Sequence, residues 1–330
     1  MTTPSAKSSD ESPDEGQTAG EHPNLSLKTK LRAWWEGYDL SGLKRRGDGE
    51  DAGKGKGKKT AEDNTGKPGM NRFGKPLWTA SRIEVSEKIW GAGFVIPGGI
   101  ETISTLVKPL GLNPAMTVLE LGCGLGGATR CMAAQFGCWV TGLESSPFLV
   151  EQGMERSTKA GQSKQAPVQI YDPENLKYAK RVDAVFAKEV FFTIKDKSTL
   201  FDRIEGLLKP RGQILITDYI IEPEARNSKA VKAWADREPL EPNLWTLQGA
   251  LDAFAQCNLD LRVHEDITEP HRNHIVASIK SLMEHLEKHH MDKDTKVNVI
   301  DEVETWAQRV TALHSGLKCY RFYALKPPEA

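Results

Sequence analysis

Short apolar runs alternate with amphipathic stretches along the chain from about residue 76 onward. Such runs are typical of buried strands, and the stretches between them have helical spacing, so the pattern predicts parallel strands joined by crossover helices. The predicted strands are residues 117–121, 139–143, 168–171, 182–187, 213–219, 259–263 and 319–325. The predicted helices are residues 128–136, 147–160, 197–208 and 247–257. We therefore expect an α/β fold with a Rossmann-like, seven-stranded, mostly parallel sheet.

Two longer segments, residues 221–244 and 270–314, interrupt this alternation. Both are polar, rich in charge and helix-prone, and both follow predicted strands. Because insertions at the strand ends of an open sheet lie over the ligand crevice, we expect helical lids. Surface decoration without a role at the crevice is the alternative.

The first 75 residues have a different composition, rich in small, polar and charged residues. Such a segment buries too little apolar surface to offset its chain entropy. The pattern predicts a disordered extension over residues 1–75, with a short amphipathic helix at about 25–40 that carries Trp34 and Trp35, followed by a basic Gly/Lys linker. The globular domain is expected over residues 76–330.

Charge and cysteine usage narrow the class of protein. The 330 residues include 44 Lys and Arg against 45 Asp and Glu, a net charge of -1, so no overall field favours nucleic acid as a partner. The N-terminus has no basic start followed by an apolar run, and no apolar run reaches the roughly 18 residues that span a bilayer, so we expect a soluble, cytoplasmic protein. The five scattered cysteines lack zinc-like spacing, and no metal site is expected.

The loop after the first predicted strand is rich in glycine. Residues 118–130 read V-L-E-L-G-C-G-L-G-G-A-T-R, and Gly122, Gly124 and Gly126 let the backbone turn sharply and approach a ligand before a helix begins. The glycine spacing also fits the dinucleotide fingerprint, so the loop alone leaves a nicotinamide cofactor open. Glu120, at the mouth of the loop, would repel a pyrophosphate but suits an ammonium and a sulfonium, which favours S-adenosylmethionine.

Polar residues at the ends of the next strands extend this candidate cofactor site. Glu144 ends the second strand, where a carboxylate can accept both ribose hydroxyls. Asp172 closes the third strand, where it can accept a hydrogen bond from an adenine amino group; a helix cap is the alternative. Ser145, next to Glu144, and Lys188, directly after the fourth strand, complete the predicted cofactor contacts.

Residues 207–219 carry the second informative motif, L-L-K-P-R-G-Q-I-L-I-T-D-Y, in which a helix stops and a buried strand leads to the crevice. Together with the glycine loop, this run resembles the class I methyltransferase family, which implies an S-adenosylmethionine-dependent enzyme. Residues 78–102, W-T-A-S-R-I-E-V-S-E-K-I-W-G-A-G-F-V-I-P-G-G-I-E-T, further resemble the phosphoethanolamine methyltransferases, which methylate a phosphorylated amine stepwise.

The resemblance implies roles for individual residues. It places four residues on the family's cofactor contacts: Glu120, Gly122, Glu144 and Asp172. Tyr219 falls on a tyrosine that contacts substrate, and Glu189 keeps the charge of an aspartate that contacts the amine. Where the family has a catalytic tyrosine and histidine, however, this chain has Trp78 and Thr193, neither of which can shuttle a proton near neutral pH.

At the acceptor side, Glu189 is the leading candidate for orienting or deprotonating the nucleophile, with the Tyr219 hydroxyl across the crevice. A surface carboxylate paired with Lys188 is the alternative for Glu189. The predicted substrate contacts are Trp78 and Phe192, as parts of an aromatic site for cationic nitrogen, and Arg237, as a weak candidate, with Lys232, for holding an anion.

The second lid carries two histidines, His271 and His274, which would replace the missing base if the lid folds inward. Solvated histidines on a helix surface are the commoner situation, so this hypothesis is the less favoured one.

These features predict an S-adenosylmethionine-dependent methyltransferase that acts on a small polar acceptor, expected to be an amine. Two alternatives remain open from the residues alone. In one, the helix at about 25–40 lies on a membrane surface and the acceptor is a lipid or quinone. In the other, the chain binds S-adenosylmethionine without catalysis, because its proton relay is missing.

Overall fold

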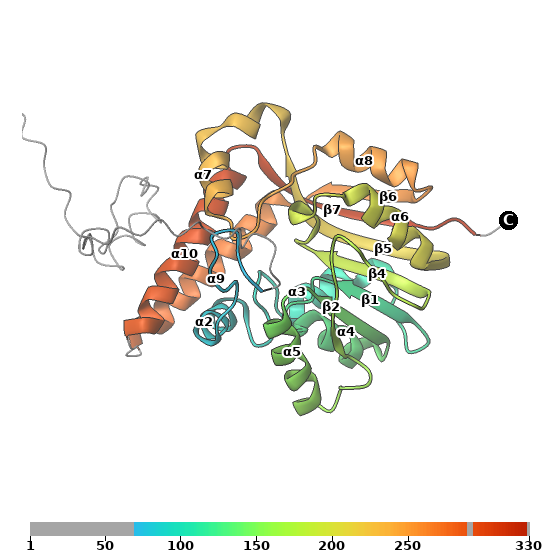
Figure 1. The fold of residues 1–330 in the computed structure, drawn as a ribbon, viewed down its shortest axis with the longest axis horizontal. Coiled ribbons are helices and arrows are strands. Elements are labelled where there is room, and N and C mark those ends of the chain that lie inside the picture. Colours follow the sequence, from blue (N-terminus) through green and yellow to red (C-terminus); the bar gives the residue numbers. More distant parts are fainter. Residues whose placement is uncertain (1–68, 289–292, 329–330) are drawn as a thin grey trace, which may run out of the picture. The chain divides into compact units, whose positions relative to one another are not determined.

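A seven-stranded sheet lies at the centre of residues 69–288 and 293–328, the part of the chain that the computed structural model describes. Its strand order is β3-β2-β1-β4-β5-β7-β6 (Figure 1). The strands are β1 (Thr117–Leu121), β2 (Trp139–Glu144), β3 (Val168–Ile170), β4 (Val182–Lys188), β5 (Leu208–Ile221), β6 (Asp260–Asp266) and β7 (Leu317–Leu325). Strands β1 to β5 pair in parallel, whereas β7 is antiparallel to both β5 and β6. The predicted Rossmann-like, mostly parallel sheet is confirmed.

Helices cover both faces of this sheet. They include α3 (Ile100–Leu106), α4 (Gly127–Phe136), α5 (Pro147–Lys159), α6 (Lys197–Leu207) and α8 (Leu247–Gln256), with the 3-10 turn η1 (Lys108–Leu110) after α3. Helices α4 and α5 lie against β2 and the edge strand β3, whereas α6 lies against β5 and α8 against β6. From β1 the chain proceeds to β2 and β3, and from β4 it proceeds in the opposite direction to β5. Because parallel crossovers are right-handed, α4 and α5 therefore lie on one face of the sheet and α6 and α8 on the other.

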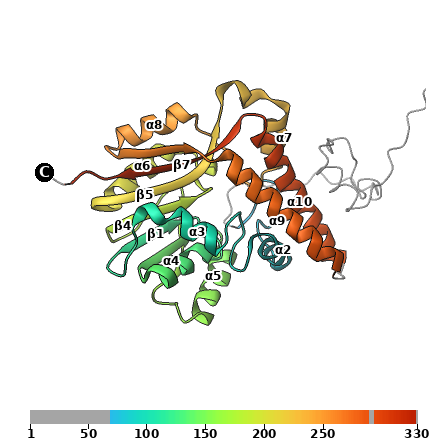
Figure 2. The same cartoon turned by 180° about the vertical axis from the view of Figure 1, so that it is seen from behind.

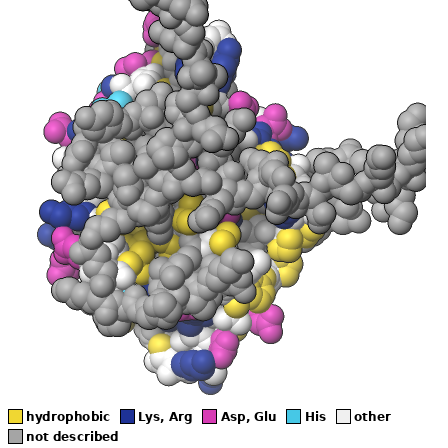
Figure 3. Space-filling model, turned by 90° about the vertical axis from the view of Figure 1, so that its left-hand side faces the viewer, with side chains coloured by type: hydrophobic (Ala, Val, Ile, Leu, Met, Phe, Trp, Pro, Cys, Tyr) yellow, Lys and Arg dark blue, Asp and Glu magenta, His cyan; other side chains and the backbone are white. Residues whose placement is uncertain are grey.

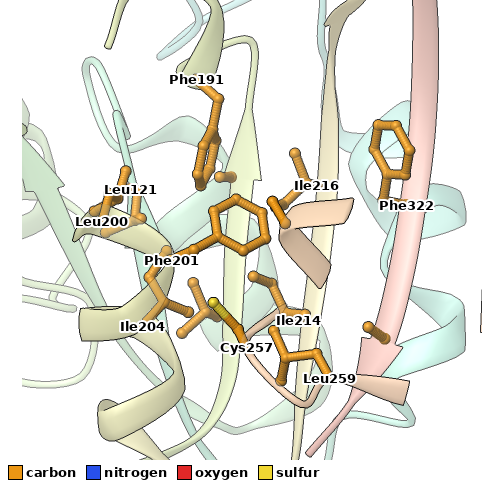
Figure 4. Packing of buried hydrophobic residues seen from close by; sticks show 14 of the residues in the cluster. Leu121, Phe191, Leu200, Phe201, Ile204, Ile214, Ile216, Cys257, Leu259 and Phe322 are labelled. Atoms are coloured by element: carbon orange, nitrogen blue, oxygen red, sulfur yellow. The ribbon is translucent and has the colours of Figure 1, made fainter. Parts of the chain in front are cut away.

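The central strands are apolar because both of their faces are covered by helices. In β4, for example, Val185, Phe186 and Ala187 are all fully buried. A large apolar cluster, which includes Phe201, Ile214 and Ile216, fills the space between β4, β5, α6 and α8 (Figure 4). In this cluster Phe201 meets Phe254 edge to face at a centroid distance of 5.0 Å. This packing fixes the positions at which the strands end, and hence the site.

A further group of helices lies at the carboxyl end of the parallel strands: α2 (Ala80–Trp90), α7 (Lys229–Arg237), α9 (Thr268–Lys288) and α10 (Lys293–Leu313). Helix α10 packs against α2, α7 and α9 (Figures 1 and 2). At the α2–α10 contact the rings of Trp90 and Trp306 meet edge to face at 4.6 Å. Helix α7, preceded by η3 (Pro223–Asn227), and helices α9 and α10 occupy the two segments predicted as lids.

Strand β5 departs from its predicted bounds, because it begins at Leu208 and not near residue 213. The pairing of β5 with β4 shifts register between Val182 and Ala184, and Pro210 and Gly212 lie in the irregular stretch opposite this shift. Proline is tolerated within a sheet at such bulges, since no ladder hydrogen bond is lost there. The Pro-Arg-Gly run therefore bends a strand and does not precede it.

Every described residue belongs to one unit of the chain, Thr60–Ala330. Near its start, Met70 forms a bridge with Pro76, and Arg72 donates its backbone N–H to Pro239 O at 3.0 Å. The predicted disordered extension, the amphipathic helix at about 25–40 and the Gly/Lys linker lie outside the described residues, apart from residues 69–75.

Charged side chains of both signs lie among apolar ones on the face in Figure 3, in keeping with the net charge of -1. In residues 69–288 and 293–328, the helices are all too short or too polar to cross a bilayer.

Candidate active site

The glycine loop between β1 and α4 makes one end of the site. Gly122, Gly124 and Gly126 have φ values of 65°, 56° and 73°, in the left-handed region that favours glycine. A Cβ atom on Gly122 would lie 2.3 Å from Val190 Cγ2, so a side chain there would clash. Glycine at this position therefore allows the loop to pack closely beside the residues that follow β4.

Two buried carboxylates face the glycine loop, Glu144 at the end of β2 and Glu120 in β1. The Glu144 carboxylate accepts hydrogen bonds from the backbone N–H groups of Gly124, at 3.0 Å, and Ser146, at 2.8 Å. Burial raises the pKa of Glu144, and it raises the pKa of Glu120 to about 8 although the Thr129 hydroxyl donates to Glu120. A cationic ligand beside Glu120 would favour its ionised form.

A cavity of about 210 Å³ extends from this loop to the helices at the end of the sheet. At one end it is lined by Gly122, Gly124, Glu144 and Ser145. Trp78, which packs against the apolar cluster of Leu125 and Leu149, lines it beside the glycine loop, and Glu189, Phe192, Glu238, Trp306 and Arg309 line it towards the helices. The predicted cofactor contacts Gly122, Gly124, Glu144 and Ser145 and the predicted acceptor contacts Trp78, Glu189 and Phe192 thus border one continuous space.

Glu189 occupies the turn that follows β4, and its backbone is unusual. Its φ is 56°, a region that non-glycine residues rarely adopt, and its N–H donates to Thr217 O at 2.7 Å. The following turn is held by the Asp218 carboxylate, which accepts from the N–H groups of Val190, at 3.0 Å, Phe191 and Phe192. These hydrogen bonds fix a conformation that directs Glu189 into the cavity lining.

The Glu189 side chain is buried at 1% exposure and surrounded by basic groups. It pairs with Lys188, and its Oε2 lies 3.6 Å from Nη1 of Arg309. Burial alone would raise the pKa of Glu189, but the neighbouring cations, Lys188 first among them, lower it to about 2. Glu189 is therefore a buried carboxylate that stays ionised at neutral pH.

Tyr219 and His271 extend from Glu189 as a hydrogen-bonded triad. The Tyr219 hydroxyl donates to Glu189 Oε2 at 2.7 Å and lies 2.9 Å from His271 Nε2. Because the hydroxyl has one proton, which it donates to Glu189, His271 must donate through Nε2–H. Burial lowers the pKa of His271 to about 4, so the ring is neutral near pH 7.

The inward position of His271 corrects the expectation that a histidine on this lid helix is solvated. His271 is only 9% exposed, and it shares a helix face with the buried Ile275 and Ile279. That i, i+4, i+8 spacing was visible in the sequence and would have indicated a buried histidine. The neighbouring His274 is half-buried, and its ring lies 6.5 Å from that of Trp90.

Arg309 is the main residue of the site that the sequence interpretation missed. It lies on α10, donates to the Glu238 carboxylate, and stacks over the Trp306 ring at 4.2 Å. The buried Val303, Trp306 and Val310 flank it on the same helix. An arginine within an apolar helix face was the available signal, because such a residue is buried only with a partner.

The structure does not bring every predicted residue into the cavity lining. Arg237, predicted to hold an anion, instead pairs with Glu304 at 3.0 Å and donates to Thr305 at 3.2 Å, so it joins α7 to α10. Asp172 is exposed and accepts from Glu174 N at 3.0 Å, as in the helix-cap alternative. The cavity is lined there by the adjacent residues Tyr171 and Pro173.

Other predicted residues lie at or next to the cavity. Lys188, Trp78 and Thr193 line it, and Trp78 packs under the guanidinium of Arg82 at 4.2 Å. Gly126 precedes α4 outside the lining, and Tyr219 lies behind Glu189. Tyr219 would therefore act on a ligand through Glu189 and not by direct contact.

Comparison with known proteins gives the family. Residues 112–317 match the family model described as a methyltransferase domain, which is more than half of the chain. The chain belongs to this methyltransferase family. The match covers β1 to α10 and therefore includes the glycine loop, Glu189 and Arg309.

Several relatives of this methyltransferase domain act on phosphorylated amines according to their names. Phosphoethanolamine N-methyltransferase 1 of Arabidopsis thaliana is 31% identical over 163 residues, which are 49% of this chain and 33% of the plant protein. Phosphoethanolamine N-methyltransferase 2 of Caenorhabditis elegans is 26% identical over 77% of this chain and 57% of that protein. The chain thus spans about a third of the plant relative.

A solved structure has the same fold. Phosphoethanolamine N-methyltransferase 2 of Haemonchus contortus, in complex with phosphomonomethylethanolamine and S-adenosylhomocysteine, superposes with a TM-score of 0.67 at 22% identity. The match covers 77% of this chain and 62% of that protein. At this level of identity the likeness extends to the fold.

Proposed function

We propose that this methyltransferase domain transfers a methyl group from S-adenosylmethionine to the nitrogen of a small amine. The observation that carries the proposal is the continuous cavity, with the glycine loop and Glu144 at one end and the ionised, buried Glu189 at the other. The names of the plant and nematode relatives, all N-methyltransferases of an amine, support the same reaction.

The residues around the glycine loop fit S-adenosylmethionine. Gly122 and Gly124 let the loop turn sharply at the cavity wall, and Glu144 Oε2, which accepts from Gly124 N, keeps a lone pair for a ribose hydroxyl. Glu120 would face the cationic amino acid end. When bound, S-adenosylmethionine supplies an electrophilic methyl group, so the protein mainly needs to align the acceptor and exclude water.

At the acceptor end, Glu189 would bind an ammonium group and hold its nitrogen towards the glycine loop. The turn held by Asp218 fixes Glu189, and Tyr219, held in turn by His271, donates to the second carboxylate oxygen. The aromatic rings of Trp78, Phe192 and Trp306 border the same space, where their faces favour a cation and keep water out.

An ammonium must lose a proton before its nitrogen can attack. With a pKa of about 2, Glu189 is suited to binding the ammonium and is a weak base. His271 is neutral near pH 7 and donates through Nε2–H to Tyr219, so it holds the Tyr219 hydroxyl as a donor to Glu189 and, with a pKa of about 4, is also a weak base. We therefore propose that the amine that reacts is the fraction that has lost its proton to solvent, and that Glu189 orients its N–H groups.

The proposal is tested with the purified full-length chain, methyl-labelled S-adenosylmethionine and a panel of primary, secondary and tertiary small amines. Label in at least one amine, dependent on the protein, is the expected result. S-adenosylmethionine binding without label in any amine of the panel would contradict the proposal.

A further inference from the structure

The basic side chains at the acceptor end of the cavity are all paired with carboxylates. Of the described residues that line the cavity, Arg82, Lys188 and Arg309 are the basic ones. Each has an acidic partner that lines the same cavity: Glu302, Glu189 and Glu238, respectively. The acceptor end therefore holds three cations and three carboxylates, with no excess of positive charge.

The pairing of Arg309 is the most extensive of the three. Its Nε and Nη2 both donate to Glu238 Oε1, at 3.1 and 2.5 Å, and its Nη1 lies 3.6 Å from Glu189. Its side chain is only 7% exposed and lies against the rings of Trp306 and Tyr219. Both edges of this guanidinium are thus directed at carboxylates of the protein itself.

Arg82 and Lys188 are likewise paired with carboxylates of the protein. Arg82 donates through Nε to Glu302 at 3.0 Å and through Nη1 to Leu77 O at 2.6 Å, while its plane covers Trp78. Lys188 pairs with Glu189, and its side chain is 11% exposed. A phosphate entering this space would have to displace a buried carboxylate or accept the repulsion of three of them.

We propose that this site takes an amine without a phosphate group and discriminates against a phosphorylated one. This inference rests on the proposed function and specifies its substrate class. An uncharged or cationic amine brings no negative charge to this balanced set of ion pairs, whereas a phosphorylated amine brings about two negative charges to an acceptor end that has no spare cation. The site thereby differs in specificity from an enzyme that binds phosphomonomethylethanolamine, as the Haemonchus protein does.

The two basic residues that the sequence offered for an anion support this assignment. Arg237 lies outside the cavity lining and is paired with Glu304, and Lys232 is exposed on the same helix, α7.

A binding experiment separates the two substrate classes. The full-length chain, saturated with S-adenosylhomocysteine, is titrated calorimetrically with choline and with phosphocholine, which differ only in the phosphate. We expect choline to bind at least about tenfold more tightly, because like-charge contacts in a desolvated site cost several kcal/mol. Equal or tighter binding of phosphocholine would overturn the inference, as would no binding of choline.

Two variants test the role of the paired carboxylates. Glu238→Gln keeps an acceptor for Trp234 but removes the charge that neutralises Arg309, so phosphocholine affinity should rise relative to choline. Glu302→Gln should act in the same direction through Arg82, and it provides a second measurement if Glu238→Gln fails to fold. The control is Glu265→Gln, which removes a carboxylate paired with Arg321 at a half-exposed surface site and should leave the ratio unchanged.

Failure of this inference can be told apart from failure of the proposed function. Methyl transfer to phosphoethanolamine but not to ethanolamine would keep the function and reject the inference. Preferential binding of choline without methyl transfer to any amine would reject the function and keep the charge preference of the site.

Discussion

At the scale of single residues, Glu189 is the central group of the proposed acceptor site. A non-glycine residue in the left-handed region costs about 1–2 kcal/mol, and the three N–H groups that donate to Asp218 hold the turn in place. Backbone strain of this kind concentrates at functional sites, and here it places an ionised carboxylate beside aromatic rings.

Glu189→Gln should lower turnover about 100-fold, since the amide keeps the shape of the side chain but no longer attracts an ammonium. Cofactor affinity should not change, because Glu189 lies at the other end of the cavity from Glu144. Initial rates and calorimetry with S-adenosylhomocysteine measure the two effects. Glu155→Gln, at an exposed pair with Lys159, is the matched control. Unaltered turnover in Glu189→Gln would remove Glu189 from the site.

Glu144→Ala should weaken S-adenosylmethionine binding at least about tenfold, because hydrogen bonds to a charged group contribute about 1.5–3 kcal/mol each. Asp172→Ala, by contrast, removes an exposed cap and should change this affinity little. Calorimetry on both variants decides between the two predicted contacts. Equal losses would mean that Asp172 reaches the adenine after all.

Glu120 should make cofactor binding depend on pH. Burial raises its pKa to about 8, so it is largely protonated at neutral pH, and a cationic ligand that lowers this pKa must displace the proton. Affinity for S-adenosylmethionine should therefore rise from about pH 6 to about pH 7, where the ligand's own amino group, with an ordinary pKa of about 7.7–8.0, stays mostly protonated. In Glu120→Gln the affinity should be flat over this range; a slope equal to that of the wild type would assign the proton to another group.

At the scale of elements, helices α9 and α10 complete the site that the strands begin. Helix α9 brings His271 against Tyr219, and α10 brings Arg309 against Glu238 and Glu189. On the buried faces of these helices, His271 reaches Tyr219 of β5 and Arg309 reaches Glu189 after β4, whereas Glu302 pairs with Arg82 of α2.

His271→Phe should change the acid sensitivity of the fold. The folded-state pKa of about 4 lies below the usual 6.5, so the unfolded chain binds more protons between these values, and stability falls as the pH drops from about 6.5 to about 4. Between about pH 6.5 and about pH 4 the melting temperature of His271→Phe should therefore fall less than that of the wild type. Asp218, whose pKa burial raises to about 7, contributes in the opposite direction, but it does so equally in both proteins. The exposed His264→Gln is the control. Identical slopes in His271→Phe and wild type would show that His271 is not buried in solution.

Arg237→Ala should lower the free energy of unfolding by about 1 kcal/mol and leave KM for the acceptor unchanged, because Arg237 joins α7 to α10 through a half-exposed ion pair. Denaturant unfolding and steady-state rates check the two parts. Lys232→Ala on the same helix should change neither. A large rise in KM in Arg237→Ala would restore the predicted anion-binding role.

The sequence predicts the sheet well because each buried strand appears as a short apolar run, and because the turn after β1 needs glycines at positive φ. Strand β1 has its predicted bounds, and Glu120 and Glu144 line the cavity as expected. The partners of Glu189 were harder to predict, because His271 and Arg309 come from helices some 80 and 120 residues further along the chain, and their direction depends on tertiary packing. Asp172 and Arg237 lie outside the cavity lining because each has a local partner, a turn N–H or a residue of a neighbouring helix, that a motif does not reveal.

At the scale of the whole molecule, one sheet and one group of helices enclose a space with two chemically different ends. The glycine loop lies at one end, with two buried carboxylates, and Glu189 lies at the other, among aromatic rings and paired charges. Because both ends border one cavity, the proposed methyl donor and amine would lie next to each other in it.

The most direct test of this central claim locates the transferred methyl group. The full-length chain is incubated with carbon-13 methyl-labelled S-adenosylmethionine and small amines without phosphate, and the products are examined by NMR. We expect a labelled carbon bonded to nitrogen, formed by the wild type and strongly reduced in Glu189→Gln. Label on oxygen, sulfur or carbon, or equal N-methylation by Glu189→Gln, would contradict this claim.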